Sequence, residues 1–173
     1  MAPEFIFNAQ LILGYVAWLL CFRAYILPKL KSMNAVAVQR AIATLHSFRF
    51  FGLVFILPGV IGNLPSGFGP FAAYWDFATG VLAILALLTV RIRPIFWSFV
   101  VAFNIVGTID LVFDYYHAVR LGLPAIAGQL GATYAIPVLY VPLLMITHVT
   151  AFYLLLRRAP KVAQVRAANA VAL

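Results

Sequence analysis

The apolar residues of the chain fall into five long runs, separated by short polar or proline-containing segments. A helix that crosses the hydrocarbon of a bilayer needs about 20 mostly apolar residues. The pattern therefore predicts an all-α fold, a polytopic integral membrane helical bundle of about five transmembrane helices. These helices are expected at about residues 5–27, 43–61, 71–90, 95–116 and 134–156.

Prolines, glycines and one asparagine mark the expected ends of these helices. Pro28 is expected to end the first helix, because a proline inside a helix removes a backbone hydrogen bond. Asn34 is a good N-cap for the second helix. A glycine-rich loop is predicted at 121–133, and Pro137 and Pro142 should kink the last helix.

Composition supports a membrane protein. Of the 173 residues, 65% are hydrophobic and 9% are charged, and the mean hydropathy is +1.05. A soluble domain usually has about 25% charged residues, so the lipid bilayer is the expected surrounding. Residues 1–173 show no break in composition, which favours a single transmembrane domain with a basic cytoplasmic tail at 157–173.

The basic residues predict an orientation. Loops on the cytoplasmic side of a membrane retain lysine and arginine. Alternate loops of the five-helix arrangement are basic, with Arg120 as the exception, so we expect an outside N-terminus and a cytoplasmic C-terminus in a bacterial inner membrane. The bases concerned are Lys29, Lys31, Arg40, Arg91, Arg93, Arg157, Arg158, Lys161 and Arg166. Because they mark helix ends, the net charge of +8 does not indicate nucleic-acid binding.

The four acids all lie in the predicted outer half of the bundle, and two of them form a stripe. Asp110, Asp114 and His117 have the spacing i, i+4, i+7, which places them on one helical face together with Gly107. Asp76 can join them from the third helix, or it can cap that helix if the helix begins later. A carboxylate at this depth is costly, so it should face the bundle interior or a wet cavity.

This stripe has a functional and a structural interpretation. Two carboxylates one turn apart repel each other, and a proton, a histidine or a bound cation would relieve the repulsion. The functional interpretation is an outer-facing acidic pocket for a small molecule or cation. In the structural one, Asp110 bonds to a neighbouring helix, while Asp114 and His117 lie in the membrane interface.

A second polar group is predicted toward the cytoplasmic side. It consists of His46 and Arg49 in the second helix and His148 in the fifth. Two histidines on different helices can ligate a haem. Alternatively, His46 and Arg49 reach the interface or bind lipid phosphate, and His148 bonds within the bundle. No spacing of His or Cys residues supplies paired zinc ligands, so no metal site is predicted.

One stretch of the sequence resembles a known family. The run that begins at Arg49, RFFGLVFILPGVIGNLPSGFGPFAAYWDFATGVLAILAL, is similar to small bacterial multi-pass proteins of the DoxX-like kind. It covers about a quarter of the chain, mainly in glycines and apolar residues. The resemblance implies a small inner-membrane protein and assigns no chemistry to individual residues.

Three classes of function follow from these observations. The favoured one is a protein that binds a small molecule or cation in the outer acidic pocket, as a transporter or a small intramembrane enzyme. The second is a non-catalytic subunit that binds partners in a larger membrane complex or a homo-oligomer. The third is a b-type haem protein of electron transfer.

Overall fold

The computed structural model describes residues 1–156, and every regular element in this part of the chain is helical. The all-helical prediction is therefore confirmed for the described residues. The predicted basic tail, 157–173, lies outside them.

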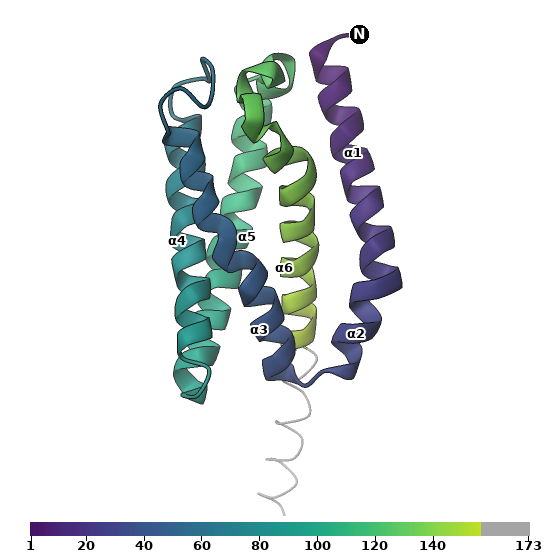
Figure 1. Cartoon of the computed structure of the whole chain (residues 1–173), viewed down its shortest axis with the longest axis vertical. Coiled ribbons are helices and arrows are strands. Elements are labelled where there is room, and N and C mark those ends of the chain that lie inside the picture. The colour runs from purple at the N-terminus through teal and green to yellow at the C-terminus, as the bar shows by residue number, and fades with distance from the viewer. Residues whose placement is uncertain (157–173) are drawn as a thin grey trace, which may run out of the picture.

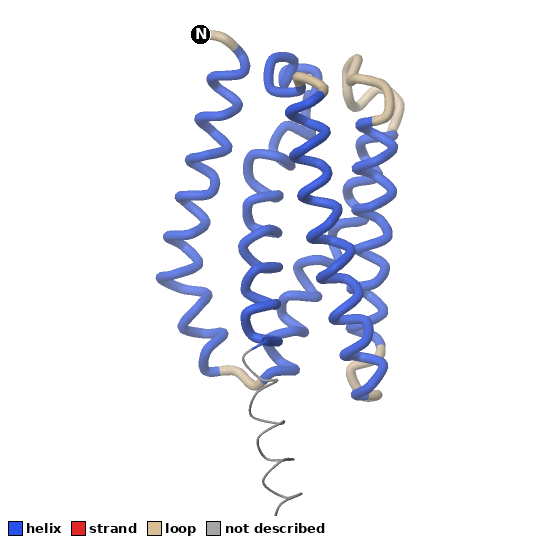
Figure 2. The backbone as a smooth tube through the Cα atoms, turned by 180° about the vertical axis from the view of Figure 1, so that it is seen from behind, coloured by secondary structure: helices blue, strands red, loops and turns tan. Residues whose placement is uncertain are grey.

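The described residues form five rods that run up and down beside one another, with the N-terminus and the end of α6 at opposite ends (Figures 1 and 2). A capping segment of 3-10 turns, η3, precedes the last rod. The elements are α1 (Pro3–Cys21), η1 (Phe22–Ile26), α2 (Leu27–Ser32), α3 (Ala35–His46), η2 (Ser47–Ile56), α4 (Phe68–Leu88), α5 (Arg93–Arg120), η3 (Leu123–Tyr134), η4 (Ile136–Tyr140) and α6 (Val141–Leu156).

Four helices in the described residues are long and apolar enough to cross a membrane: Pro3–Ser32, α4, α5 and Ile136–Leu156. The rod formed by α3 and η2 is not among them. It begins earlier than the predicted span at 43–61, its first half contains polar residues, and its second half is a 3-10 helix. Asn34 caps α3 as predicted, since its side chain accepts a hydrogen bond of 2.9 Å from the backbone of Ala37.

In the first and last rods, a π segment lies beside a proline and the helix continues. The first rod does not stop at Pro28; it passes through the π segment η1 and continues to Ser32. The last rod likewise contains the π segment η4, just before Pro142. A π turn absorbs the carbonyl that a proline leaves unbonded. This explains why the first rod continues past Pro28, which was expected to end it.

The other boundaries differ by a few residues from the prediction. α5 extends to Arg120 and is longer than the predicted 95–116. α4 begins at Phe68, three residues before the predicted start at about 71. The expected loop at 121–133 is folded into the short 3-10 turns of η3.

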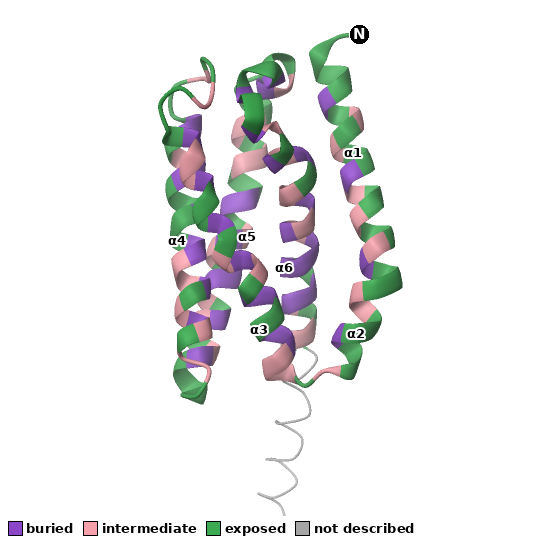
Figure 3. Ribbon diagram, in the orientation of Figure 1, coloured by how far each residue is buried: buried purple, intermediate pink, exposed green. Residues whose placement is uncertain are grey.

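Buried and exposed residues alternate along the rods (Figure 3). Many of the exposed residues are large and apolar, as expected of a bundle in lipid. Exposed examples are Leu13, Leu20 and Val149. The buried apolar residues form two separate clusters. One contains Phe96 and Phe103, and the other contains Phe55 and Phe68. A layer of buried polar residues lies between them.

Candidate functional site

Arg49 is the centre of the buried polar layer, and it belongs to η2. Its side chain is fully buried. Nε donates a hydrogen bond of 2.5 Å to Asp76 Oδ1 on α4. Nη2 donates to Asp110 Oδ2 on α5, and Nη1 donates to the carbonyl of Gly107 at 3.3 Å. One guanidinium therefore joins three rods through two ion pairs.

Glycines allow these rods to approach closely enough for the ion pairs to form. A Cβ at Gly52 would lie 2.5 Å from the Cβ of Asp76, and a Cβ at Gly107 would lie 2.6 Å from Arg49 Nη1. Real Cβ atoms do not come this close to other heavy atoms, so side chains at these two positions would push Arg49 and Asp76 apart. Gly107 and Asp110 were predicted to share one face of α5, and in the structure both contact Arg49.

The position of Arg49 corrects the expectation that it lies near the cytoplasmic interface. The rod begins at Ala35, so Arg49 lies roughly 20 Å along it at about 1.5 Å per residue. The side chain is fully buried and turns inward to the carboxylates, so it does not reach out to the interface. The two polar groups that were predicted separately are therefore in contact through Arg49 and Asp110.

The role of Asp76 is also decided by the helix boundary. α4 begins at Phe68, which places Asp76 in the body of the helix and rules out a role as its cap. Asp76 is 7% exposed. Its two structural roles are the ion pair with Arg49 and a place in the wall of a cavity.

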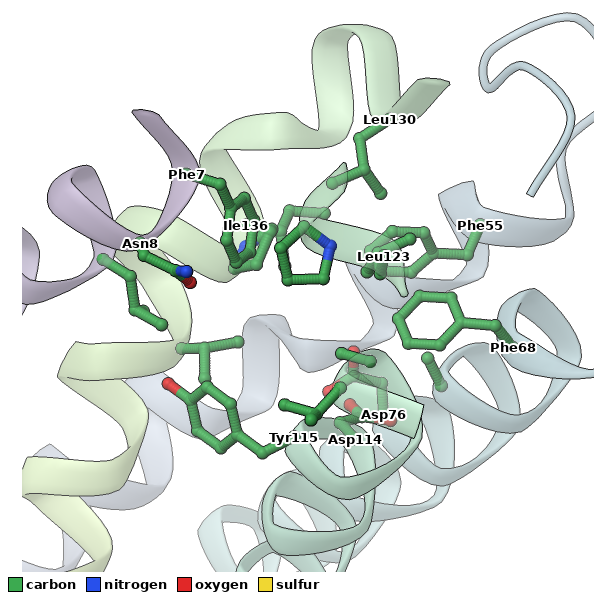
Figure 4. A pocket seen from close by; sticks show the side chains of 17 residues that line it. Phe7, Asn8, Phe55, Phe68, Asp76, Asp114, Tyr115, Leu123, Leu130 and Ile136 are labelled. Atoms are coloured by element: carbon green, nitrogen blue, oxygen red, sulfur yellow. The ribbon is translucent and has the colours of Figure 1, made fainter. Parts of the chain in front are cut away.

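A cavity of about 80 Å³ lies beside the ion pairs, at the end of the bundle that holds the N-terminus (Figure 4). Asp76 and Asp114 contribute the carboxylates in its wall. Four aromatic side chains line it together with aliphatic residues of α1, η3 and the start of the last rod. The aromatic residues are Phe7, Phe55, Phe68 and Tyr115.

Two carboxylate oxygens of this region are buried and accept no hydrogen bond within the protein. They are Asp110 Oδ1 and Asp114 Oδ1. Asp110 does not line the cavity, and its other oxygen accepts from Arg49, whereas Asp114, one turn further along α5, does line it. A bare, buried carboxylate oxygen is unusual in a folded protein, because most buried polar atoms have a partner.

The structure does not bring all the predicted site residues together. His117 does not line this cavity. Its ring packs against Phe71 with the ring centroids 4.6 Å apart, and it borders a separate surface hollow with Arg120. It lies one turn beyond Asp114 on α5, so the shared helical face passes the cavity before it reaches His117. Gly107 contacts Arg49 but does not line the cavity either.

The rings of His46 and His148 are in contact, with their centroids 4.0 Å apart and their planes tilted by 40°. The Nδ2 of Asn104 donates to the carbonyl of Val100, so its Oδ1 accepts from His148 Nδ1 at 2.9 Å. The hydroxyl of Thr147 donates to its own helix and accepts from His46 Nε2 at 3.0 Å. His148 Nε2 and His46 Nδ1 then remain as buried lone-pair nitrogens without a partner.

The contact between the two rings leaves no space between them. Rings whose centroids are 4.0 Å apart are in contact, so a planar macrocycle does not fit between them in this arrangement. The described residues contain no group of three or more His, Cys, Asp and Glu side chains suited to a metal ion.

Residues 6–156 match the family described as "Domain of unknown function (DUF8737)". Since the match covers most of the chain, the protein belongs to this family. The chain matches no curated protein and no solved structure.

Proposed function

We propose that this protein is a multi-pass bacterial inner-membrane protein that binds a small organic cation in the cavity lined by Asp76 and Asp114. The N-terminus is outside and the C-terminus is cytoplasmic. The topology is supported by the described bases at the end of the bundle opposite the N-terminus, where α2 meets α3 and α4 meets α5 (Figure 1). They are Lys29, Lys31, Arg91 and Arg93.

The observation that carries the proposed ligand class is the combination of carboxylates and aromatic rings in one cavity. A cation is attracted to the face of an aromatic ring, by about 2 kcal/mol or more when the site is dry, and aromatic cages are used to bind quaternary ammonium groups. Four aromatic side chains line the cavity together with Asp114, whose buried Oδ1 has no hydrogen-bond partner among the described residues. A small ammonium ion with apolar substituents fits both features.

The charges around the cavity favour the same ligand. Arg49 carries one positive charge, while Asp76, Asp110 and Asp114 carry three negative charges when ionised. A cation in the cavity reduces this excess, and a neutral molecule of the same shape does not. Because the site lies inside the bundle, where the dielectric constant is low, this difference should decide selectivity.

The test compares tetramethylammonium and benzyltrimethylammonium with the neutral tert-butanol, using isothermal titration calorimetry on the detergent-purified protein. We expect at least one of the two cations to bind and tert-butanol not to bind. Asp114→Asn should weaken the binding of the cation by about tenfold or more, a loss of about 1.4 kcal/mol. Glu4→Gln is the matched control, because Glu4 is an exposed acid at the start of α1 outside the cluster.

Equal affinity of wild type and Asp114→Asn, or failure of both cations to bind, would contradict the proposal. The interpretation as a non-catalytic subunit of a membrane complex would then be preferred.

A further inference from the structure

The carboxylates of the site outnumber the positive charges beside them. Arg49 Nε and Nη2 are each used on one oxygen, of Asp76 and Asp110 respectively. Asp110 Oδ1 and Asp114 Oδ1 remain bare and buried. With all three acids ionised, the cluster of Arg49, Asp76, Asp110 and Asp114 has a formal charge of −2, and each uncompensated charge in a membrane interior is costly.

A proton is the smallest species that can compensate one of these charges while the cavity is empty. Asp110 and Asp114 are one helical turn apart on α5, so their charges repel each other. A proton on one of the two bare oxygens removes that repulsion and supplies a hydrogen-bond donor among the acceptors. A proton on Asp114 leaves both ion pairs of Arg49 intact, and a proton on Asp110 Oδ1 still lets Oδ2 accept the hydrogen bond from Arg49 Nη2.

The histidine pair is a less favourable place for this proton. His148 Nε2 and Arg49 Nη1 each lie 2.6 Å from the position of a Cβ at Gly107, so the two nitrogens are at most twice that distance apart. A proton on Nε2 would face the guanidinium directly. His46 packs against the ring of His148, and neither of its ring nitrogens bonds to a carboxylate, so a proton there would have no acidic partner.

We propose that the site exchanges an organic cation for a proton, which Asp110 and Asp114 hold while the cavity is empty. The inference rests on the proposed cation-binding function. When the cation binds, the O–H bond of the protonated carboxyl breaks, its electron pair stays on the oxygen, and the proton leaves to water. The total charge of the buried cluster plus its ligand stays the same, so neither state has an additional uncompensated charge in the membrane.

The exchange has a defined signature in titration calorimetry with a permanently charged cation. The tighter binder of tetramethylammonium and benzyltrimethylammonium is used, because neither can lose a proton itself. Titrations at pH 7 in phosphate and in Tris, whose heats of ionisation differ, give the number of protons released per cation bound. We expect about one proton in wild type, and a Kd that falls about tenfold per pH unit of increase across the range in which the cluster is protonated.

Variants identify the groups that hold the proton. Asp110→Asn should bind the cation with the proton release lost, since one of the two bare carboxylate oxygens is gone and Asp114 still faces the cavity. Glu4→Gln and His148→Asn should keep the release of about one proton. If His148→Asn loses the release while Asp110→Asn retains it, the assignment to the carboxylates is wrong.

The experiment distinguishes failure of the proton exchange from failure of cation binding. If the cation binds to wild type without proton release and with a Kd independent of pH, the exchange is refuted and the cation-binding function stands. If neither cation binds, both are refuted.

Discussion

Replacing Arg49 by methionine should destabilise the bundle strongly, because it leaves two buried carboxylates without their shared partner. Methionine is unbranched and apolar, so it can occupy much of the space of the arginine stem without the charge. In the structure Arg49 is fully buried, and Asp76 and Asp110 are 7% and 0% exposed. Removing one partner of such a buried ion pair costs about 3–5 kcal/mol.

The loss should be partly reversed by neutralising Asp110 in the same protein. Asp110→Asn alone should cost about 1–3 kcal/mol, because Arg49 keeps Asp76 and loses one charged hydrogen bond. In Arg49→Met/Asp110→Asn only Asp76 remains unpaired, at the wall of the cavity. The double variant should therefore be more stable than the sum of the single effects predicts, by about 1 kcal/mol or more.

Thermal unfolding in mild detergent measures these effects, with the labelling of Cys21 by a thiol-reactive dye as the signal. Cys21 is the chain's one cysteine and is partly buried in α1. At about 2–4 °C per kcal/mol, Arg49→Met should lower the Tm by about 6–20 °C. Arg40→Met, which removes an exposed arginine from the same rod, should change it by less than about 2 °C.

Two results would refute this reasoning. One is a Tm of Arg49→Met that equals that of Arg40→Met. The other is strict additivity in the double variant, which would mean that Arg49 and Asp110 do not depend on each other.

Two other measurements test the packing and the topology. Gly107→Ala should lower the stability by about 1–3 kcal/mol, because its Cβ would meet Arg49, His148 and Thr79 at 2.6–2.7 Å; Gly128→Ala, where a Cβ meets nothing within 4 Å, should be neutral, and equal Tm values for the two variants would contradict the close packing of Gly107 against Arg49. Of two reporters fused after Leu173, the one that is active only in the cytoplasm should give a signal. A signal from the one that is active only in the periplasm would contradict the proposed orientation.

The helical architecture was predictable from the sequence because it depends on local properties. Long apolar runs form helices that satisfy their own backbone hydrogen bonds wherever lipid is the solvent. The cap at Asn34 is also local, and it was predicted correctly. The effect of Pro28 was misjudged, since the π turn before it depends on what the flanking turns pack against.

The candidate site could be predicted only in part, for the same reason. The shared face of Asp110 and Asp114 follows from the helical period. Whether Asp76 would cap its helix or face the interior depended on where α4 begins. His117 has the right spacing and lies outside the cavity, because spacing gives a face of the helix but not how far the cavity extends along it.

By itself the sequence determined that the chain is helical, apolar enough for a membrane, and basic at the helix ends, and it placed two carboxylates on one face of a helix. Only the tertiary structure decided that Arg49 lies between Asp76 and Asp110 and that aromatic side chains from several rods close the cavity. The periodicity of one helix shows which residues share a face. It does not show which faces meet, because that depends on the close approach that Gly52 and Gly107 allow and on the ion pairs that only the assembled rods can form.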